Sequence, residues 1–537
     1  MSDSSPAPAS AETRPDRMPA GAAALTGVLA LAAALAMGHL VAAFVGIGAS
    51  PYLAVGNSAI DLTPAPVKDW AIETFGSYDK VALLGGMAVV MVLAAVVAGL
   101  VSRRSALPGT LVIAVFGVVG GVAVYTRPAL GQLALLAPLA GLLAGLAVFR
   151  WLHALALRGV SAIGEHEIAP PGADTRVQPA DTANRRRFLV GASGVALGAG
   201  VAGLGGQLLG QAKNAEGSRQ AIGTLRVADP APPVPDGADF RRLGTPAFLT
   251  PNKDFYRVDT ALVVPQVRAE DWSLRVHGMV DRELRLDYAD LRSRPLVERT
   301  ITLCCVSNEV GGPYISTANF IGVELADVLA EAGVRPGAEQ LFSTSVDGWT
   351  CGTPVEAALD RDRGALLAIG MNSEPLPLEH GFPVRMVVPG LYGYVSATKW
   401  LTDIEITTWD ARRAYWLDRG WAREAPVKTQ SRIDAPEAFE KVPSGRVTVA
   451  GIAWAQTTGI AKVEVSIDDG PWRPTELSTA VNEDTWRMWR IDVDLRPGQH
   501  KVVCRATDRS GYTQTDRRQP TVPDGATGRH TVLFEVT

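Results

Sequence analysis

Cysteine is scarce in this sequence, with four residues among 537. So few thiols exclude a disulfide-stapled scaffold, and the lack of any C-x-x-C pair argues against a zinc site. An excess of positive charge is also missing, because 51 Lys and Arg stand against 55 Asp and Glu, a net charge of −4. We therefore expect no nucleic-acid partner.

Apolar residues, by contrast, are abundant and unevenly distributed. The mean hydropathy of +0.12 is high for a globular protein. Residues 1–215 contain 14 Lys and Arg against 11 Asp and Glu, whereas the remainder contains 37 against 44. The length allows three or four domains. The chain therefore divides into a basic, apolar first part and an acidic second part.

Five uncharged stretches are each long enough to cross the bilayer core, which takes about 20 apolar helical residues. They predict transmembrane helices at about residues 20–46, 81–101, 108–126, 128–149 and 188–212. We expect an all-α membrane region over residues 18–212, in contact with membrane lipid, after a short tail at 1–17.

The positions of the cations predict the orientation of these helices, since Lys and Arg accumulate in cytoplasmic loops. Cations flank alternate ends of the spans, at Arg14, Arg17, Arg103, Arg104, Arg150 and Arg158. The loop from Ser50 to Lys80 is acidic. We expect a multi-pass protein of the cytoplasmic membrane with a cytoplasmic N-terminus and everything after about residue 212 outside, extracellular or periplasmic.

The fifth span opens with the string Arg185-Arg186-Arg187-Phe188-Leu189. This string resembles a twin-arginine export signal, and it also fits an ordinary cationic flank of a membrane helix. The export interpretation requires that the outer domain receives an inserted group, such as a cofactor, before translocation, because this pathway moves folded proteins. Runs rich in Pro, Ala and Asp at 169–183 and 227–236 predict linkers, and we assign 213–243 as the linker to the outer domain.

The outer part falls into two patterns. Over 244–408, strands expected at 262–264, 272–276 and 300–303 mix with a helix at 324–332, which predicts an α+β domain. Over 409–537 only strands are expected, at 446–450, 461–467, 487–493, 500–506 and 530–536. Their spacing favours a β-sandwich of immunoglobulin-like type.

The chemistry is expected in the loop that contains Cys304 and Cys305, directly after a predicted strand. A thiol there fits a nucleophile, a disulfide partner, a metal ligand or a buried inert side chain. Nothing nearby in the sequence supplies the His and Asp that a cysteine protease needs.

A family resemblance decides among these alternatives. The segment Thr302-Leu303-Cys304-Cys305-Val306-Ser307-Asn308 resembles the T-L-x-C-x-x-N segment of the sulfite oxidase family of molybdenum enzymes. Further segments follow in that family's order, at 371–377, 380–385, 388–390 and 399–401. The C-terminal strands are similar to the family's dimerisation domain, so the resemblance covers about 244–537.

The resemblance implies a single molybdopterin whose molybdenum is bound by two pterin sulfurs and one protein thiolate. Cys305 is the implied metal ligand, and Arg257 the implied substrate-orienting residue. The positions implied to contact cofactor or substrate are Tyr256, Arg257, Asn308, Thr344, His380, Arg385, Ser396 and Lys399. Cys304 is interpreted as a buried strand-end thiol, with a vicinal disulfide as the alternative, and Cys351 and Cys504 as structural.

Departures from the family pattern bear on the substrate. The family's Asn-His pair after the arginine is replaced by Val258-Asp259, its arginines after the ligand cysteine by Glu309 and Val310, and its active-site tyrosine by Ile369. Fewer cations and an added acid disfavour a small dianion such as sulfite. The main prediction is a sulfite-oxidase-like enzyme that catalyses two-electron oxygen-atom transfer on a small substrate. The alternative enzyme is a reductase of protein methionine sulfoxide or of another S- or N-oxide. The non-enzymatic alternative is a membrane-tethered binding module with a decayed active site.

Bis-histidine haem requires facing histidines within the spans, and only His39 and His153 are placed near any span. We therefore expect no haem. The expected partners are a small-molecule substrate, an electron-transfer partner (a quinone, a cytochrome or another redox protein) and a second copy bound through the sandwich.

Overall fold

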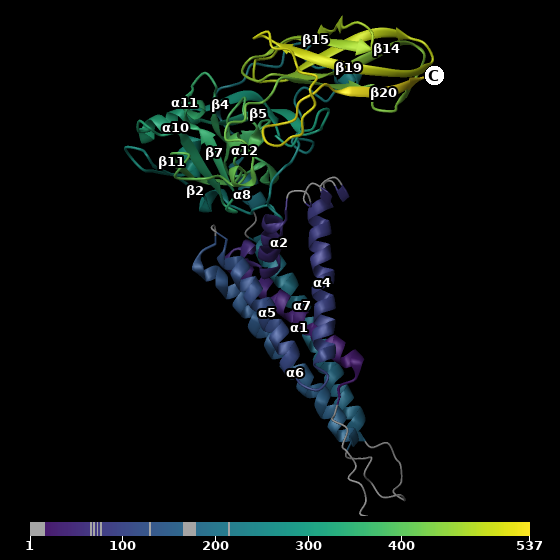
Figure 1. Ribbon diagram of the computed structural model, residues 1–537. Helices are drawn as coiled ribbons and strands as arrows, with labels where there is room; N and C mark the ends of the chain where they lie inside the picture. The colour runs from purple at the N-terminus through teal and green to yellow at the C-terminus, as the bar shows by residue number, and fades with distance from the viewer. Residues whose placement is uncertain are drawn as a thin grey trace, which may run out of the picture. The chain divides into compact units, whose positions relative to one another are not determined.

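The computed structural model describes residues 17–64, 67, 70, 71, 74, 75, 78–127, 130–164, 179–212 and 215–537. The chain divides into two compact units, Met1–Lys213 and Asn214–Thr537. Figure 1 colours the first unit purple to blue and the second teal to yellow.

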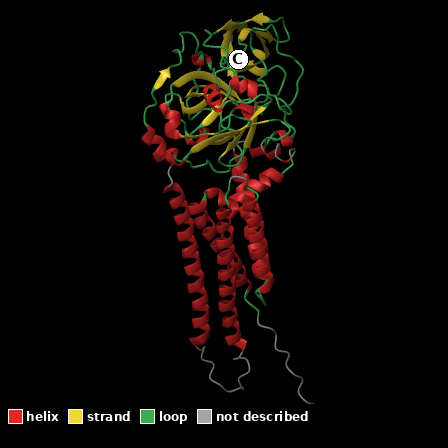
Figure 2. Cartoon of the chain, turned by 90° about the vertical axis from the view of Figure 1, so that its left-hand side faces the viewer, coloured by secondary structure: helices red, strands yellow, loops and turns green. Residues whose placement is uncertain are grey.

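The first unit is built from helices, drawn red in Figure 2. They are α1 (Ala20–Val45), α2 (Pro51–Leu62), α4 (Asp79–Val101), α5 (Leu107–Tyr125), α6 (Leu136–Gly164) and α7 (Pro179–Ala212). All of these except α2 contain a stretch long and apolar enough to cross a membrane. Helix α1 packs on α4, α6 and α7. Close approach to α4 needs small residues, because a Cβ on Gly27 or on Gly99 would collide with the facing backbone.

The helix boundaries differ from the sequence prediction for the fourth and fifth apolar helices. The fourth α-helix begins at Leu136, after a short 3-10 helix (Gln132–Leu135), and not at about residue 128, and it continues through Arg150 to Gly164. The fifth begins at Pro179, a residue suited to the first helical turn. The linker predicted over 169–183 is therefore wrong at 179–183. Its residues 169–178, and most of the predicted tail, lie outside the described residues.

The second unit begins with an α+β part made of two sheets. The first contains β1 (Val227–Asp229), β4 (Leu296–Cys304), β5 (Ile315–Glu324), β8 (Leu366–Met371) and β10 (Arg385–Val387), with β9 (Glu374–Pro375) paired to β8. The second contains β3 (Leu284–Asp287), β2 (Ser273–Gly278), β11 (Leu401–Thr407), β6 (Gln340–Ser345) and β7 (Thr350–Pro354). The helices of this part are α8 (Ala215–Ile222), α9 (Tyr288–Ser293), α10 (Leu325–Ala332), α11 (Val355–Leu359) and α12 (Gly393–Ser396).

Strands β4 and β5 form the antiparallel pair on which the cysteine loop is built. Their β-branched residues suit a pleated, buried surface, and Ile301, Leu303 and Ala318 are buried in the core. The strands expected at 272–276 and 300–303 and the helix at 324–332 are confirmed.

Two predictions in this part are wrong. Residues 262–264 form no strand, since Pro265 follows at once and Val263 is exposed. The expected linker 213–243 is instead part of the fold. Ala215 and Ile222 of α8 are buried in the hydrophobic core, and β1 pairs in parallel with β4.

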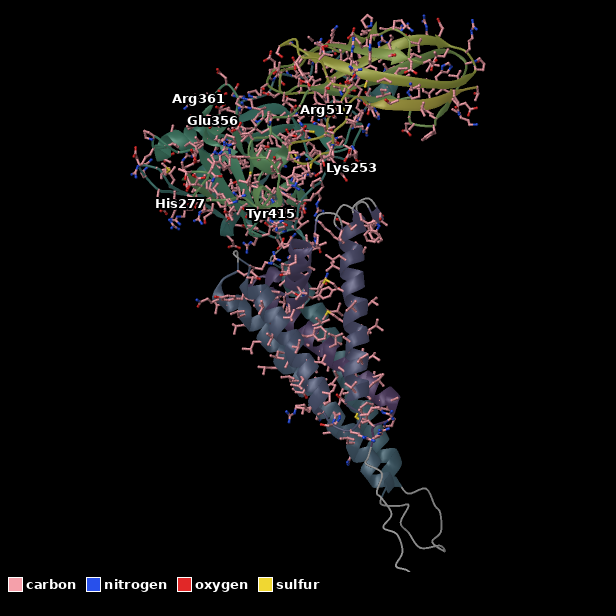
Figure 3. The ribbon with its side chains drawn as sticks, viewed as in Figure 1. Lys253, His277, Glu356, Arg361, Tyr415 and Arg517 are labelled. Carbon is pink, nitrogen blue, oxygen red and sulfur yellow. The ribbon has the colours of Figure 1, made fainter. Side chains whose placement is uncertain are left out.

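The C-terminal part is a pair of sheets, as predicted. One contains β12 (Gln430–Ala435), β14 (Gly445–Trp454), β18 (Arg487–Leu495) and β17 (Glu476–Leu477). The other contains β13 (Lys441–Val442), β20 (Thr531–Val536), β19 (Gly498–Asp508), β15 (Ile460–Ile467) and β16 (Arg473–Pro474). Val449 of the first and Val465 and Phe534 of the second share one core. Arg517 lies on this part, whereas His277 and Tyr415 lie on the α+β part (Figure 3).

The two parts of the second unit are joined by buried contacts beside β4. Trp486 is buried in the core of the α+β part, and its indole N–H donates to Phe248 O at 3.1 Å. The Trp486 backbone N–H donates to Thr302 Oγ1 at 2.8 Å, and Thr302 N donates to Asp484 O at 3.0 Å. The strand that leads to the cysteines is therefore held from the sandwich side.

Candidate active site

The loop after β4 is closed by its own backbone and by one side-chain amide. Cys305 N donates to Tyr314 O at 3.0 Å, and Asn308 N donates to Cys305 O at 3.0 Å. Asn308 Oδ1 accepts from Tyr314 N at 2.8 Å. A Cβ on Gly312 would lie 2.6 Å from Asn308 Oδ1, so the turn requires glycine there. The loop thus fixes Cys305 at the end of the strand.

The two adjacent thiols have different surroundings. Burial raises the pKa of Cys305, and the backbone N–H and hydroxyl of Ser307 and the charge of Lys399 oppose that rise. Burial raises the pKa of Cys304 well above its usual value, and the neighbouring Cys305 adds to this, against the Asn308 side chain and Arg432. Both thiols are free, so the vicinal disulfide is not formed. Cys305 is the thiol better able to become a thiolate.

Arg385 and His380 are buried with unsatisfied ring or guanidinium atoms. Arg385, on β10, is 3% exposed and donates from Nη1 to His380 O at 3.1 Å, whereas its Nε has no partner. Burial lowers the pKa of Arg385 to about 10. Its guanidinium lies 5.6 Å from the centre of the Phe320 ring. No carboxylate pairs with this cation among the ion pairs of the described residues.

His380 is a neutral imidazole. Burial, followed by the charges of Lys399 and Arg385, lowers the pKa of His380 to about 3. Its Nε2 lies 3.0 Å from Asn252 O, and Nδ1 is buried without a partner. Because a carbonyl only accepts, Nε2 carries the proton and Nδ1 presents a lone pair. The site therefore offers one buried acceptor beside one buried cation.

Arg257 and Lys399, unlike Arg385, share a carboxylate. Asp259 Oδ2 lies 3.0 Å from Arg257 Nε and 3.2 Å from Lys399 Nζ. The side chains of Asp259 and Lys399 are only 7% and 11% exposed, whereas Arg257 is 42% exposed. Burial lowers the pKa of Lys399 to about 8, although Asp259 opposes this. Lys399 Nζ also donates to Glu379 O at 3.0 Å.

Aromatic side chains pack beside these groups. Phe255 stacks on Tyr256 with ring centres 5.4 Å apart and meets His380 edge-on at 5.4 Å. Burial raises the pKa of Tyr256 well above its usual value, and the two thiols add to this rise. A Cβ on Gly393 would lie 3.9 Å from the Tyr256 hydroxyl, which places the start of α12 beside it.

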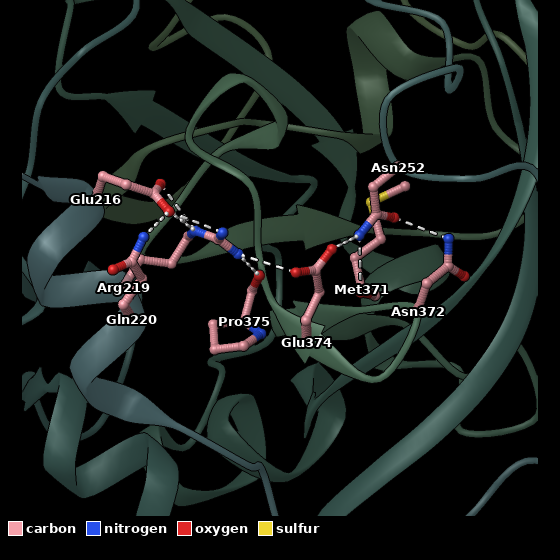
Figure 4. Close-up of polar contacts among 8 residues, drawn as sticks. All are labelled: Glu216, Arg219, Gln220, Asn252, Met371, Asn372, Glu374 and Pro375. Atoms are coloured by element: carbon pink, nitrogen blue, oxygen red, sulfur yellow. Dashed lines mark hydrogen bonds and ion pairs between the residues drawn. The ribbon is translucent and has the colours of Figure 1, made fainter.

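A chain of polar contacts runs from α8 to Asn252 and Asn372 (Figure 4). Arg219 of α8 donates to Pro375 O at 3.0 Å and pairs with Glu374 at 3.3 Å. Glu374 accepts from Asn252 Nδ2 at 2.5 Å, and Asn252 Oδ1 accepts from Asn372 Nδ2 at 2.8 Å. The carbonyl of Asn252 is the one that His380 contacts. Helix α8 is thus connected to the imidazole.

Two family profiles match the second unit. Residues 261–416 match the oxidoreductase molybdopterin binding domain, and residues 423–522 match the Mo-co oxidoreductase dimerisation domain. Chicken (Gallus gallus) sulfite oxidase is 32% identical over 321 residues, which cover 51% of this chain and 69% of that protein. The chain belongs to the sulfite oxidase family.

The similarity is confined to part of each relative. Human (Homo sapiens) mitochondrial sulfite oxidase is 31% identical over 329 residues, which cover 51% of this chain and 59% of that protein. The chain therefore spans about three fifths of the length of the mammalian relatives it matches. The sulfane dehydrogenase SoxCD of Paracoccus pantotrophus matches with 22% identity and a TM-score of 0.48, over 54% of this chain and 84% of that one.

The buried groups fit the molybdopterin of the family. A pterin phosphate is an anion, and Arg385 is a buried cation with an unpartnered Nε–H to donate. His380 Nδ1 is a buried acceptor for a pterin N–H. Among the described residues no group of three or more His, Cys, Asp or Glu could hold a metal, and Cys305 is a free, buried cysteine directly after β4.

Most of the residues predicted from sequence come together here. Linked contacts or mutual charge effects join Tyr256, Arg257, Cys305, His380, Arg385 and Lys399, and Asn308 closes the cysteine loop. Two predicted residues stand apart. The Ser396 hydroxyl donates to Leu391 O and Tyr392 O, both at 3.1 Å. Thr344 lies on β6, and no hydrogen bond or ion pair described for the chain joins its hydroxyl to this cluster.

The structure also shows the surroundings of three residues that differ from the family pattern. Ile369 is fully buried in the core on β8, and Val310 is buried while Glu309 is exposed. Sequence analysis missed the roles of Asn252, Ser307 and Glu374, and it treated Asp259 only as a departure. Ser307 could have been found by its position two residues after Cys305. The role of Asn252 depends on contacts with residues more than 100 positions away.

Proposed function

We propose that the chain is a membrane-anchored molybdenum-cofactor oxidoreductase that transfers one oxygen atom and two electrons on a small substrate outside the cytoplasmic membrane. Three buried groups carry the proposal. They are the Cys305 thiol, which accepts hydrogen bonds from Ser307, the Arg385 cation, which has no carboxylate partner among the described residues, and the neutral imidazole acceptor of His380. A scaffold without a bound anion would gain nothing from a buried, unpaired guanidinium.

Each residue has a role in this proposal. Cys305 holds the metal, and Arg385 and His380 hold the pterin by a charge-assisted donor and an acceptor. When bound, the molybdenum centre supplies oxygen-atom transfer coupled to two electrons. Arg257, the more exposed of the two cations that contact Asp259, orients the substrate. The rings of Phe255 and Tyr256 exclude water from the reacting groups.

Two reactions fit this chemistry in opposite directions. In the first, sulfite and water give sulfate, two protons and two electrons. In the second, an S-oxide takes up two electrons and two protons, its S–O bond breaks, and a thioether and water result. The pairing of Asp259 with two cations favours the second as a candidate. A decayed binding module remains the non-enzymatic alternative, and bound molybdenum with turnover distinguishes the two.

The membrane assignment rests on the five apolar helices and on the cation distribution. The N-terminus is proposed to be cytoplasmic, the second unit outside, and the segment at Arg185–Arg187 a twin-arginine signal for a cofactor-loaded domain. Alkaline phosphatase fused after residue 230 is expected to be active and the same fusion after residue 158 inactive. The reverse pattern would invert the topology.

The remaining proposals concern partners. Electrons pass to or from a quinone, a cytochrome or another redox protein, and no haem is expected in this chain. The immunoglobulin-like sandwich is proposed to form a homodimer, supported by the match of residues 423–522 to a dimerisation domain. Light scattering of the full chain in detergent tests the dimer.

Metal analysis of the purified full chain tests the function. About one molybdenum per chain is expected, with turnover of sulfite or of an S- or N-oxide. The Cys305→Ser variant is expected to lose turnover at least a hundredfold. A wild-type chain without molybdenum would refute the enzyme assignment.

A further inference from the structure

We propose that Asp259 is a specificity-determining residue that selects uncharged oxo substrates over dianions by pairing with both Arg257 and Lys399. The inference rests on the proposed function and names its substrate class, a neutral S- or N-oxide. Asp259 replaces the histidine of the family's Asn-His pair, so the proposed selection against dianions distinguishes this chain from the family pattern.

The geometry places one carboxylate oxygen between two cations. Asp259 Oδ2 contacts Arg257 Nε at 3.0 Å and Lys399 Nζ at 3.2 Å. With one negative charge against two positive charges, the three side chains together carry one net positive charge instead of two. The Asp259 carboxylate is 7% exposed, so solvent screens it less than a surface acid.

The pairing with Asp259 changes which substrates Arg257 and Lys399 can bind. Arg257 donates its Nε–H to Asp259, and Lys399 uses its ammonium on Asp259 and on Glu379 O. A dianion arriving at these cations meets a fixed carboxylate that competes for the same donors and repels it. A neutral S–O or N–O dipole needs only one remaining guanidinium N–H and meets no such repulsion.

No other charged residue described for the site restores the positive charge that Asp259 offsets on Arg257 and Lys399. Arg385 is buried and assigned to the pterin, and His380 is neutral. Glu309, on the loop of Cys305, is acidic and exposed. Asp254, which precedes Phe255 in the same segment as Asp259, is a further exposed acid.

The test compares Asp259→Asn with Asp254→Asn in the full, metal-loaded chain at pH 7. Asp254→Asn removes the same charge from an exposed position of the same segment. Sulfite oxidation is assayed with ferricyanide as electron acceptor, and reduction of dimethyl sulfoxide and trimethylamine N-oxide with reduced methyl viologen as donor. Inhibition by inorganic sulfate gives a binding readout that does not depend on sulfite turnover.

We expect Asp259→Asn to raise kcat/KM for sulfite at least tenfold through a lower KM and to lower the sulfate inhibition constant at least tenfold. Dimethyl sulfoxide reduction should change less than threefold. Asp254→Asn should change neither. Asp259→His, which returns the family's residue type, is the second variant should the amide fail to fold.

Equal loss of both activities with a lower melting temperature would show a structural role and overturn the inference. An unchanged ratio of sulfite to sulfoxide kcat/KM would overturn it as well. Failure of the wild-type chain to turn over either substrate class refutes the proposed function instead, so the two failures are distinguishable.

Discussion

Two cationic regions of the same site are handled in opposite ways. Arg385 is buried without a carboxylate partner among the described residues, beside a neutral His380. Arg257 and Lys399 share the carboxylate of Asp259. Both regions contain cations, but only Arg257 and Lys399 have a carboxylate partner, which reduces their combined charge from two to one.

The difference indicates which anion the fold is prepared for. Burying an unpaired guanidinium destabilises the protein unless a ligand later pairs with it. A cation that is already paired has little to offer an incoming anion. The contrast supports the proposals that Arg385 binds a resident anion and that Arg257 meets a substrate of low charge.

Removal of the unpaired cation should have the largest effect. Arg385→Met is expected to lower molybdenum content at least tenfold, because the phosphate loses its buried partner. The same change should stabilise the cofactor-free chain, since the drop in the Arg385 pKa to about 10 corresponds to a burial penalty of roughly 3 kcal/mol. Thermal unfolding of chain produced without the pterin measures this.

The matched control is Arg432→Met, at a buried cation that is paired. Arg432 Nε lies 2.7 Å from Asp434, and its Nη1 donates to Gly312 O at 2.7 Å. Its removal orphans a buried carboxylate and should destabilise the protein by about 3–5 kcal/mol. If both variants shift stability in the same direction, the contrast between paired and unpaired cations is wrong.

Lys399 should give the site a pH-dependent stability. The pKa of Lys399 is about 8 in the fold and about 10.4 in the unfolded chain. Between these values the unfolded chain binds more protons, so stability rises with pH by at most about 1.4 kcal/mol per unit. Denaturant midpoints of the cofactor-free chain from pH 7.5 to 9.5, followed by tryptophan fluorescence, measure the slope.

Lys399→Met should flatten that slope. Asp259→Asn should move its onset to lower pH, because Asp259 raises the pKa of Lys399. A slope that is the same in the wild type and in Lys399→Met would assign the titration to another group.

The contacts from α8 should have the smallest effect. Glu374 is about half exposed, so Glu374→Ala is expected to destabilise the fold by about 1 kcal/mol or less. It should still shift the His380 ring signals in nitrogen NMR, because Asn252 loses its anchor. Glu216→Gln, which changes contacts of Glu216 with Arg219 and Gln220 within α8 but removes no contact of Asn252, is the control and should leave those signals in place.

The sequence predicted what depends on local pattern and missed what depends on distant partners. The apolar helices, β4, α10 and the strands of the sandwich follow from runs of suitable residues. Residues 262–264 look like a strand but gain no partner, whereas α8 looks like a linker and is held by burial of Ala215 and Ile222.

The candidate site shows the same division. Cys305, Arg385 and His380 could be placed by their motifs. The pairing of Asp259 with Lys399 could not, because 140 positions separate them and neither motif contains the other. Thr344 and Ser396 were predicted by position alone, and Ser396 uses its hydroxyl within its own turn.

X-ray absorption at the molybdenum edge of the full chain, wild type against Cys305→Ser, decides whether Cys305 binds the metal. We expect about one molybdenum per wild-type chain and one sulfur ligand fewer in any metal that the variant retains. An identical sulfur count with turnover intact in Cys305→Ser would contradict the assignment of Cys305 as the metal ligand.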